Sequence, residues 1–188
     1  MLKKILILSF LLGSGAAYSQ VAPSVRGGNS SLWVGGEFSS FSSDYDTKSR
    51  IIGPGVLVDF NVTPRLGLVG EARWLHWNGT DNQAQSDYLI GGKYAIWRFH
   101  RFTVNAKFLV GGVWIKYPVV ATGGSTGSYF AYAPGGFVDY RLTPHLSIRG
   151  DYEYQILPSA PGFYNEPSHG LTPNGFSVGV NYRILGSR

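Results

Sequence analysis

The sequence predicts an all-β fold, an eight-stranded antiparallel up-and-down transmembrane β-barrel. Apolar and polar residues alternate with a period of two, and the alternation recurs in segments of about ten residues separated by turn signals. The connections between these segments are alternately short and long. The chain has 188 residues, of which 44% are hydrophobic, 15% aromatic and 14% charged, with 26 glycines and no cysteine. Disulfide scaffolds, thiol catalysis and cysteine-ligated zinc are therefore excluded.

Residues 1–19 have the features of a signal peptide. Lys3 and Lys4 precede an apolar run over residues 5–12, and small residues lead to an expected cleavage after Ser19. This run is too short to span a bilayer as a helix, and a short N-terminal anchor is the alternative. Residues 20–30 follow as a polar periplasmic leader, and residues 31–188 form the expected outer-membrane β-barrel domain.

The first four strands are expected over residues 32–40, 51–62, 65–76 and 87–98. Each places apolar side chains on one face. In chain order these are Leu32, Val34, Gly36, Phe38; Val56, Val58, Phe60; Leu66, Leu68, Gly70, Ala72, Trp74; and Tyr88, Ile90, Gly92, Tyr94, Ile96.

The last four strands are expected over residues 101–114, 129–142, 145–156 and 175–185. Their apolar face comprises Phe102, Val104, Ala106, Phe108, Val110; Phe130, Tyr132, Gly136, Val138, Tyr140; Leu146, Ile148, Gly150, Tyr152, Tyr154; and Phe176, Val178, Val180, Tyr182, Ile184. No segment of the chain has a convincing helical pattern.

Every charged residue within these strand cores lies on the opposite face. The six acids are Glu37, Asp59, Glu71, Asp139, Asp151 and Glu153, and the six bases are Arg73, Lys93, Lys107, Arg141, Arg149 and Arg183. Charges inside a narrow barrel must be paired, because isolated buried ions are very costly. Equal numbers allow this pairing, so we expect an interior charge network, a packed interior and no open pore.

The connections define two ends of the barrel. Residues 62–65, 99–100 and 143–145 form short turns, whereas residues 41–50, 77–86, 115–128 and 157–174 form long loops rich in polar residues. Outer-membrane barrels have short periplasmic turns and long external loops, so both termini are expected in the periplasm. The short-turn side carries Arg26, Arg65, Arg98, Arg101 and Arg188, which we expect either to reach inner-leaflet phosphates or to form a solvated rim.

An internal repeat relates residues 53–74 to residues 133–154 at an offset of 80. The identities include Pro54/Pro134, Asp59/Asp139 and Pro64/Pro144, and the offset corresponds to four strands, which suggests a duplicated unit. Because a closed barrel has no edge strand to accommodate a missing amide donor, we expect Pro54 and Pro134 to mark bulges or bends.

The C-terminal run Ser177-Val178-Gly179-Val180-Asn181-Tyr182-Arg183-Ile184 resembles the signal read by the barrel assembly machinery, although residues 185–188 follow it. With the turn 142–146 and the strand after it, the chain resembles the small outer-membrane barrel family that includes the OmpA N-terminal domain and OmpX. The resemblance implies an outer-membrane location in contact with lipid, no cofactor, and a role in envelope integrity or surface contact. We expect a monomer, with Ser177, Gly179, Tyr182 and Ile184 as the assembly signal.

Two alternatives belong to other functional classes. A soluble lipocalin-type barrel would bind an apolar ligand and would have inverted faces. A lipid A-modifying outer-membrane enzyme would need a triad near the outer leaflet, for which Glu166, Ser168 and His169 are the nearest candidates. The other histidines, His76, His100 and His145, suggest no triad, so we expect no catalysis and no metal site.

Two further features of the mature chain bear on its partners. Its small, scattered charge of +3 does not favour nucleic-acid binding. The loop aromatics Tyr45, Tyr129, Phe163 and Tyr164 are expected either to anchor a partner or to form an interfacial belt.

Overall fold

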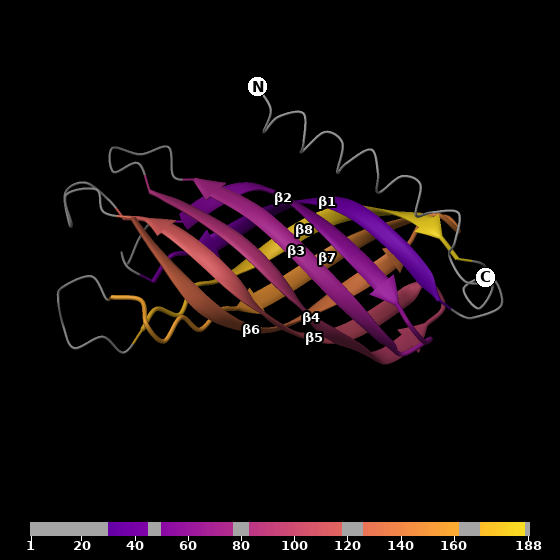
Figure 1. The fold of residues 1–188 in the computed structure, drawn as a ribbon. Coiled ribbons are helices and arrows are strands. Elements are labelled where there is room, and N and C mark those ends of the chain that lie inside the picture. Colours follow the sequence, from indigo (N-terminus) through magenta and orange to yellow (C-terminus); the bar gives the residue numbers. More distant parts are fainter. Residues whose placement is uncertain (1–29, 45–49, 77–82, 118–125, 162–169, 187–188) are drawn as a thin grey trace, which may run out of the picture.

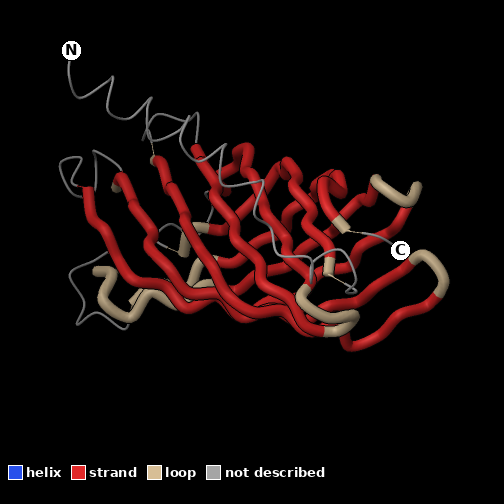
Figure 2. Tube along the Cα trace, turned by 45° about the vertical axis from the view of Figure 1, so that its right-hand side comes forward, coloured by secondary structure: helices blue, strands red, loops and turns tan. Residues whose placement is uncertain are grey.

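The structure, a computed structural model, confirms a closed antiparallel barrel of eight strands in sequence order (Figures 1 and 2). It describes residues 30–44, 50–76, 83–117, 126–161 and 170–186. The strands are β1 (Ser31–Ser42), β2 (Arg50–Asn61), β3 (Leu66–His76), β4 (Ala84–Phe99), β5 (Phe102–Lys116), β6 (Thr126–Arg141), β7 (Leu146–Tyr154) and β8 (Asn174–Leu185).

Each strand pairs with its sequence neighbours, and β1 closes the barrel against β8. Strands β4 and β6 begin at Ala84 and Thr126, earlier than the alternation predicted, so the additional residues lie at the long-loop end. A transmembrane strand needs about 9–11 residues. Strands β4, β5 and β6 have 16, 15 and 16 residues, so they extend beyond the bilayer thickness.

The repeat forms the same tight turn twice. After β2, the backbone N–H groups of Val62 and Thr63 both donate to the carbonyl of Leu66 at 3.0 Å. After β6, the N–H groups of Leu142 and Thr143 donate in the same way to Leu146, at 3.0 and 3.1 Å. Because β2–β3 and β6–β7 are four strands apart in the closed order, the two related hairpins lie on opposite sides of the barrel.

Of the bulges or bends expected at the repeated prolines, the bulges are absent from the described pairing. Pairing of β1 with β2 runs through Phe38↔Pro54, and pairing of β5 with β6 runs through Phe108↔Pro134, with no register shift at either proline. The ladder from β2 to β3 lacks pairs at Gly53 and Pro54, and the ladder from β6 to β7 begins only at Gly135. Proline has no backbone N–H to donate, and each of these prolines lies where the pairing with the next strand is interrupted.

Register shifts occur instead near the short-turn end of the barrel. One lies between Ala95 and Trp97 of β4, in the pairing with β5. The other lies between Leu32 and Trp33 of β1, in the pairing with β8. A shift of one residue reverses the facing of the side chains that follow. Ile96 and Trp97 are both exposed, at 63% and 57%, and Arg98 then lines the interior.

In the described part of the chain, no helix is long and apolar enough to cross a membrane.

Candidate functional site

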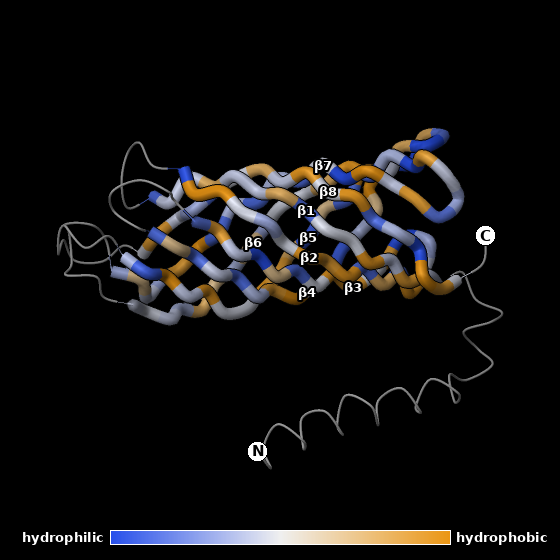
Figure 3. The backbone as a smooth tube through the Cα atoms, turned by 90° about the horizontal axis from the view of Figure 1, so that it is seen from above, coloured by the Kyte–Doolittle hydropathy of each residue, from blue (hydrophilic) through white to orange (hydrophobic). Residues whose placement is uncertain are grey.

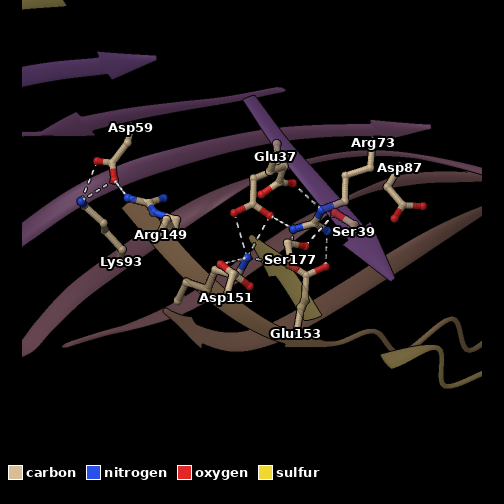
Figure 4. Close-up of polar contacts among 12 residues, drawn as sticks. Glu37, Ser39, Asp59, Arg73, Asp87, Lys93, Arg149, Asp151, Glu153 and Ser177 are labelled. Atoms are coloured by element: carbon tan, nitrogen blue, oxygen red, sulfur yellow. Dashed lines mark hydrogen bonds and ion pairs between the residues drawn. The ribbon is translucent and has the colours of Figure 1, made fainter. Parts of the chain in front are cut away.

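The centre of the barrel is filled by a charge cluster around Arg73, whose side chain is fully buried (Figure 4). Its Nε donates to Oε1 of Glu37 at 2.7 Å, and its Nη1 donates to Oε1 of Glu153 at 2.8 Å. Its Nη2 forms an ion pair with Glu71, the neighbour of Arg73 on the same face of β3. One guanidinium thus connects carboxylates from β1, β3 and β7, which restricts how these strands can be staggered.

Lys107 of β5 is the second cation of this central cluster. Its Nζ lies 2.8 Å from carboxylate oxygens of Glu71, Asp151 and Glu153. Its side chain and those of its three partners are at most 1% exposed. Ions buried this deeply need several partners each, because the attraction must offset the loss of hydration.

Asp87, which was not among the charged residues expected inside, joins the central cluster. It is fully buried on β4, where its oxygens accept from the amides of Gln85 at 2.8 Å and Gln155 at 2.9 Å. The alternation Gln85, Asp87, Leu89 could have placed Asp87 inside, had the strand been extended at its N-terminal end.

A second cluster lies nearer the short-turn end. Asp59 Oδ1 lies 2.6 Å from Lys93 Nζ, and its Oδ2 lies 2.5 Å from Arg149 Nη2. Arg149 Nε also pairs with Asp139 Oδ1 at 2.7 Å. The guanidinium of Arg149 lies 3.7 Å from the ring centroid of Phe137, which is buried in the apolar core. This stacking gives the buried guanidinium a favourable face as well as carboxylates at its edge.

The repeat explains how these clusters form. Asp59 and Asp139, which are 80 residues apart, share Arg149, and Glu71 and Asp151 share Lys107 in the same way. The repeated glycines supply the space. A Cβ at Gly55 would come within 3.0 Å of the side chain of Arg73, and one at Gly135 within 3.1 Å of Lys107. Residues related by the duplication therefore approach common cations from opposite walls.

Ten of the twelve charged residues expected inside form ion pairs. They are Glu37, Asp59, Glu71, Arg73, Lys93, Lys107, Asp139, Arg149, Asp151 and Glu153. The other two, Arg141 and Arg183, line a cavity at the short-turn end. The structure brings Arg98 and Arg101 to the same cavity, whereas we expected them either to reach inner-leaflet phosphates or to form a solvated rim.

Above the central cluster, the long-loop end of the barrel is closed by apolar side chains. The connection after β7 turns inward through paired Leu157 and Leu171, joined by backbone hydrogen bonds of 2.9 and 3.1 Å. Both leucines pack with Val113 and Ile115 of β5. Tyr129 points into this region as well, and its hydroxyl lies 3.2 Å from that of Tyr117, so its side chain faces the interior and not an interfacial belt on the outer face.

The outer surface has the reverse character. Hydrophilic and hydrophobic residues alternate along the strands (Figure 3). Aliphatic side chains in its middle are about half exposed, including Val58 at 45%, Leu68 at 51% and Ile90 at 63%. Aromatic side chains flank them at the short-turn end (Tyr94, Trp97, Phe99, Phe102, Tyr182) and the long-loop end (Phe38, Tyr88, Trp114, Phe130, Phe176). An apolar band between two aromatic girdles is typical of a barrel that spans a membrane.

These faces are the opposite of those in a lipocalin-type barrel, in which the apolar side chains point inward around a ligand cavity. The interior ion pairs and the apolar exterior therefore favour the membrane over solvent as the surroundings of this barrel.

The described histidines form no catalytic or metal arrangement. His76 ends β3, while His100 and His145 lie in short turns. Among the described residues, no three histidine or carboxylate side chains are grouped to hold a metal ion. The candidate triad of Glu166, Ser168 and His169 lies outside the described residues, as do the expected signal peptide, residues 20–29 of the leader, Arg26, Arg188 and the loop aromatics Tyr45, Phe163 and Tyr164.

The chain matches the outer membrane protein β-barrel domain family over residues 5–183. It belongs to this family. Its membership agrees with the expected resemblance to the small barrels that include OmpA and OmpX. A comparison with curated proteins finds no match.

Solved structures show the same fold at low sequence identity. Neisserial surface protein A is 10% identical with a TM-score of 0.63, and the match covers 83% of this chain and 97% of that one. Ail, the attachment invasion locus protein of Yersinia pestis, is 15% identical with a TM-score of 0.55, covering 84% and 99%. OprG of Pseudomonas aeruginosa, an outer membrane protein, is 10% identical with a TM-score of 0.56, covering 86% and 98%. The chain is thus an integral outer-membrane β-barrel protein.

Proposed function

We propose that this barrel has a structural or surface-contact role in the outer membrane and that it is not an enzyme. One observation carries the proposal: ten charged side chains of the strands form ion pairs inside the barrel, while the exposed side chains of the outer face form an apolar band. An interior filled by ion pairs at its centre leaves the two ends of the barrel as the surfaces available for contact. Residues 1–19 would direct export, and residues 20–30 would remain as a leader of the barrel domain formed by residues 31–188.

The lengths of the connections support an orientation for the barrel. Outer-membrane barrels have their short turns in the periplasm and their longer loops outside. The three short turns of this chain lie at one end, together with the start of β1 and the end of β8 (Figure 1). Both termini would therefore be periplasmic. Arg65, exposed on the outside of the first short turn, would lie at the level of inner-leaflet phosphates.

The long-loop end offers the external contact surface. Residues 126–131 of β6 pair with β5 but have no partner in the described β6–β7 ladder. That ladder begins at Gly135, with one isolated bridge at Tyr132. This end is also held in shape, because Asp44 accepts from the N–H and the hydroxyl of Thr172 at 2.8 and 2.7 Å. This contact fixes the long-loop end beside β1 and β8, and a fixed surface there would favour contact with a partner outside the cell.

The barrel assembly machinery would be a partner during biogenesis. The signal residues Tyr182 and Ile184 are 57% and 55% exposed on the outer face of β8. Ser177 and Gly179 point inward, where the hydroxyl of Ser177 lies 2.7 Å from that of Ser39 and Gly179 leaves room for Glu37. The polar half of this signal therefore also has a packing role in the folded barrel.

Membrane insertion is tested by electrophoresis of the outer-membrane fraction in detergent, with boiled and unboiled samples compared. We expect a compact monomeric species that unfolds only on heating. A protein that is soluble without detergent and shows no heat-dependent shift would contradict the proposal.

Orientation is tested with single cysteines, because the natural chain has none. Ser159→Cys places a thiol at the long-loop end, and Arg65→Cys places one at the short-turn end, both at exposed positions. A membrane-impermeant maleimide should label only Ser159→Cys in intact cells and both variants after the outer membrane is permeabilised. Labelling of Arg65→Cys alone in intact cells would reverse the orientation.

A further inference from the structure

The sequence predicts a packed interior. The short-turn end of the barrel instead contains a cavity of about 470 Å³. Seven of the eight strands contribute to its wall, and Thr63, Pro64 and Arg101 of the short turns line its mouth. This volume is within the range of about 300–1,000 Å³ typical of small-molecule sites.

The wall of this cavity is strongly basic. Six cations line it, namely Lys93, Arg98, Arg101, Arg141, Arg149 and Arg183, against two carboxylates, Asp59 and Asp139. Both carboxylates are already held by Lys93 and Arg149. The other four guanidinium groups form no ion pair with a carboxylate in the part of the chain that the structure describes.

The carboxylates that balance the positive charge of this cavity lie in the central cluster and not in the cavity wall. The central cluster holds the carboxylates of Glu37, Glu71, Asp87, Asp151 and Glu153 against the two cations Arg73 and Lys107. Interior charges that are nearly equal in number are therefore separated along the barrel axis. Lys93 and Arg149 are buried and Arg183 is half-buried, whereas Arg98, Arg101 and Arg141 are exposed. The excess of cations over carboxylates in one concave wall gives the cavity a positive potential that an anion can occupy.

Buried hydrogen-bonding groups in the wall also have no protein partner. The side-chain amide of Asn181, in a residue that is 1% exposed, has neither its Nδ2 nor its Oδ1 paired. The Nη1 of Arg149 and the Nε of Arg183 are unpaired donors as well. The residues that carry these atoms line the cavity, although the atoms themselves are covered from solvent, and buried donors without a partner are costly.

Local features of the strands turn these groups inward. The register shift between Ala95 and Trp97 brings Arg98 into the cavity wall, where regular alternation would have directed it outward. Gly35 accommodates Asn181, since a Cβ there would lie 2.0 Å from the Asn181 Oδ1. Bulges near barrel rims commonly redirect a side chain in this way.

We propose that this cavity is a binding site for a phosphate group. A phosphate presents several acceptor oxygens and negative charge, which matches unpaired guanidinium groups and a buried amide. The phosphate could belong to a soluble phosphate compound or to a lipid head group at the inner leaflet, and the chemistry recognised is the same. Access from the periplasm rests on the proposed orientation, whereas phosphate binding itself does not.

The test uses the full mature protein in octyl glucoside, a detergent without phosphate, at low ionic strength. Inorganic pyrophosphate is titrated by calorimetry into the natural protein, Arg98→Gln and Arg183→Gln, with Arg65→Gln as the control. Arg65→Gln removes the same charge from the same end of the barrel but outside the cavity lining. Heat-dependent migration verifies that each variant is a folded barrel, so a failure of the proposed membrane fold is distinguished from a failure of binding.

We expect saturable binding by the natural protein, about tenfold weaker binding by each cavity variant, and unchanged binding by Arg65→Gln. The two sources are separated by adding short-chain phosphatidylglycerol below its micellar concentration. Displacement of bound pyrophosphate by this lipid would indicate a head-group site, and no displacement would indicate a site for soluble phosphates. Absence of saturable binding, or equal weakening in Arg65→Gln, would overturn the proposal.

If either cavity variant fails to migrate as a barrel, Arg141→Gln replaces it. Arg141 is an exposed residue of the cavity wall with no ion pair to a described carboxylate, so the same loss of affinity is expected.

Discussion

Replacing Arg73 by alanine should destabilise the barrel more than almost any other single change, because Arg73 connects three carboxylates at its centre. Glu71 and Glu153 would keep ion pairs with Lys107. Glu37 would not, since Arg73 is its ion-pair partner among the described residues, and its side chain is only 1% exposed. Removing one partner of a buried pair costs about 3–5 kcal/mol, mainly because the other charge is left uncompensated.

The free energy of unfolding is measured by urea titration in phosphatidylcholine vesicles, with the fluorescence of the five tryptophans as the signal. We expect Arg73→Ala to lose about 3–5 kcal/mol, whereas Arg65→Ala, at an exposed turn, should change by about 0.5 kcal/mol or less. Adding Glu37→Gln to Arg73→Ala should restore part of the loss, because it removes the stranded charge. If Arg73→Ala were as stable as Arg65→Ala, the central charges would be solvated and the reasoning refuted.

Two further predictions concern the wall of the barrel and use the same titration. Gly91→Ala should lower the free energy of unfolding by about 1–3 kcal/mol, because its Cβ would lie 2.0 Å from the carbonyl oxygen of Phe108. Gly92→Ala should be tolerated, because its Cβ would meet nothing within 4 Å. Equal stabilities of the two variants would contradict the close approach of β4 and β5. Ile90→Lys should cost about 2–4 kcal/mol in lipid, and Val62→Lys, beside a short turn, about 0–1 kcal/mol. If both lysines were tolerated equally, the outer band would not face lipid.

Much of the fold could be predicted because alternation is a local property. Adjacent side chains of a strand point to opposite faces, so a segment such as residues 101–114 shows its two faces without any knowledge of its neighbours. The lengths of the connections then predict which strands pair, since short turns join antiparallel neighbours. The strand ends were less accurate, because β4 and β6 continue into segments whose composition resembles that of loops.

The partners of the interior charges could not be predicted in the same way. Arg73 contacts Glu37 and Glu153, which are 36 and 80 residues away, and Arg149 contacts Asp59 at a separation of 90. Such contacts depend on the stagger of all the strands around the closed barrel, which alternation along one strand does not specify. The offset of 80 in the repeat was the one long-range signal, and it relates the very residues that share Lys107 and Arg149.

The sequence by itself determined that this chain forms an eight-stranded barrel with its charges inside and its apolar side chains outside. Both properties follow from the period of two and from the cost of exposing charge to lipid or leaving it unpaired. Only the tertiary structure decided where along the axis those charges lie. The register shift after Ala95 turns Arg98 inward, and closure of β1 on β8 brings Arg183 and Asn181 to the same cavity. The positive and negative charges are balanced in number in the sequence. In the folded barrel they are separated into a carboxylate-rich centre and a basic end.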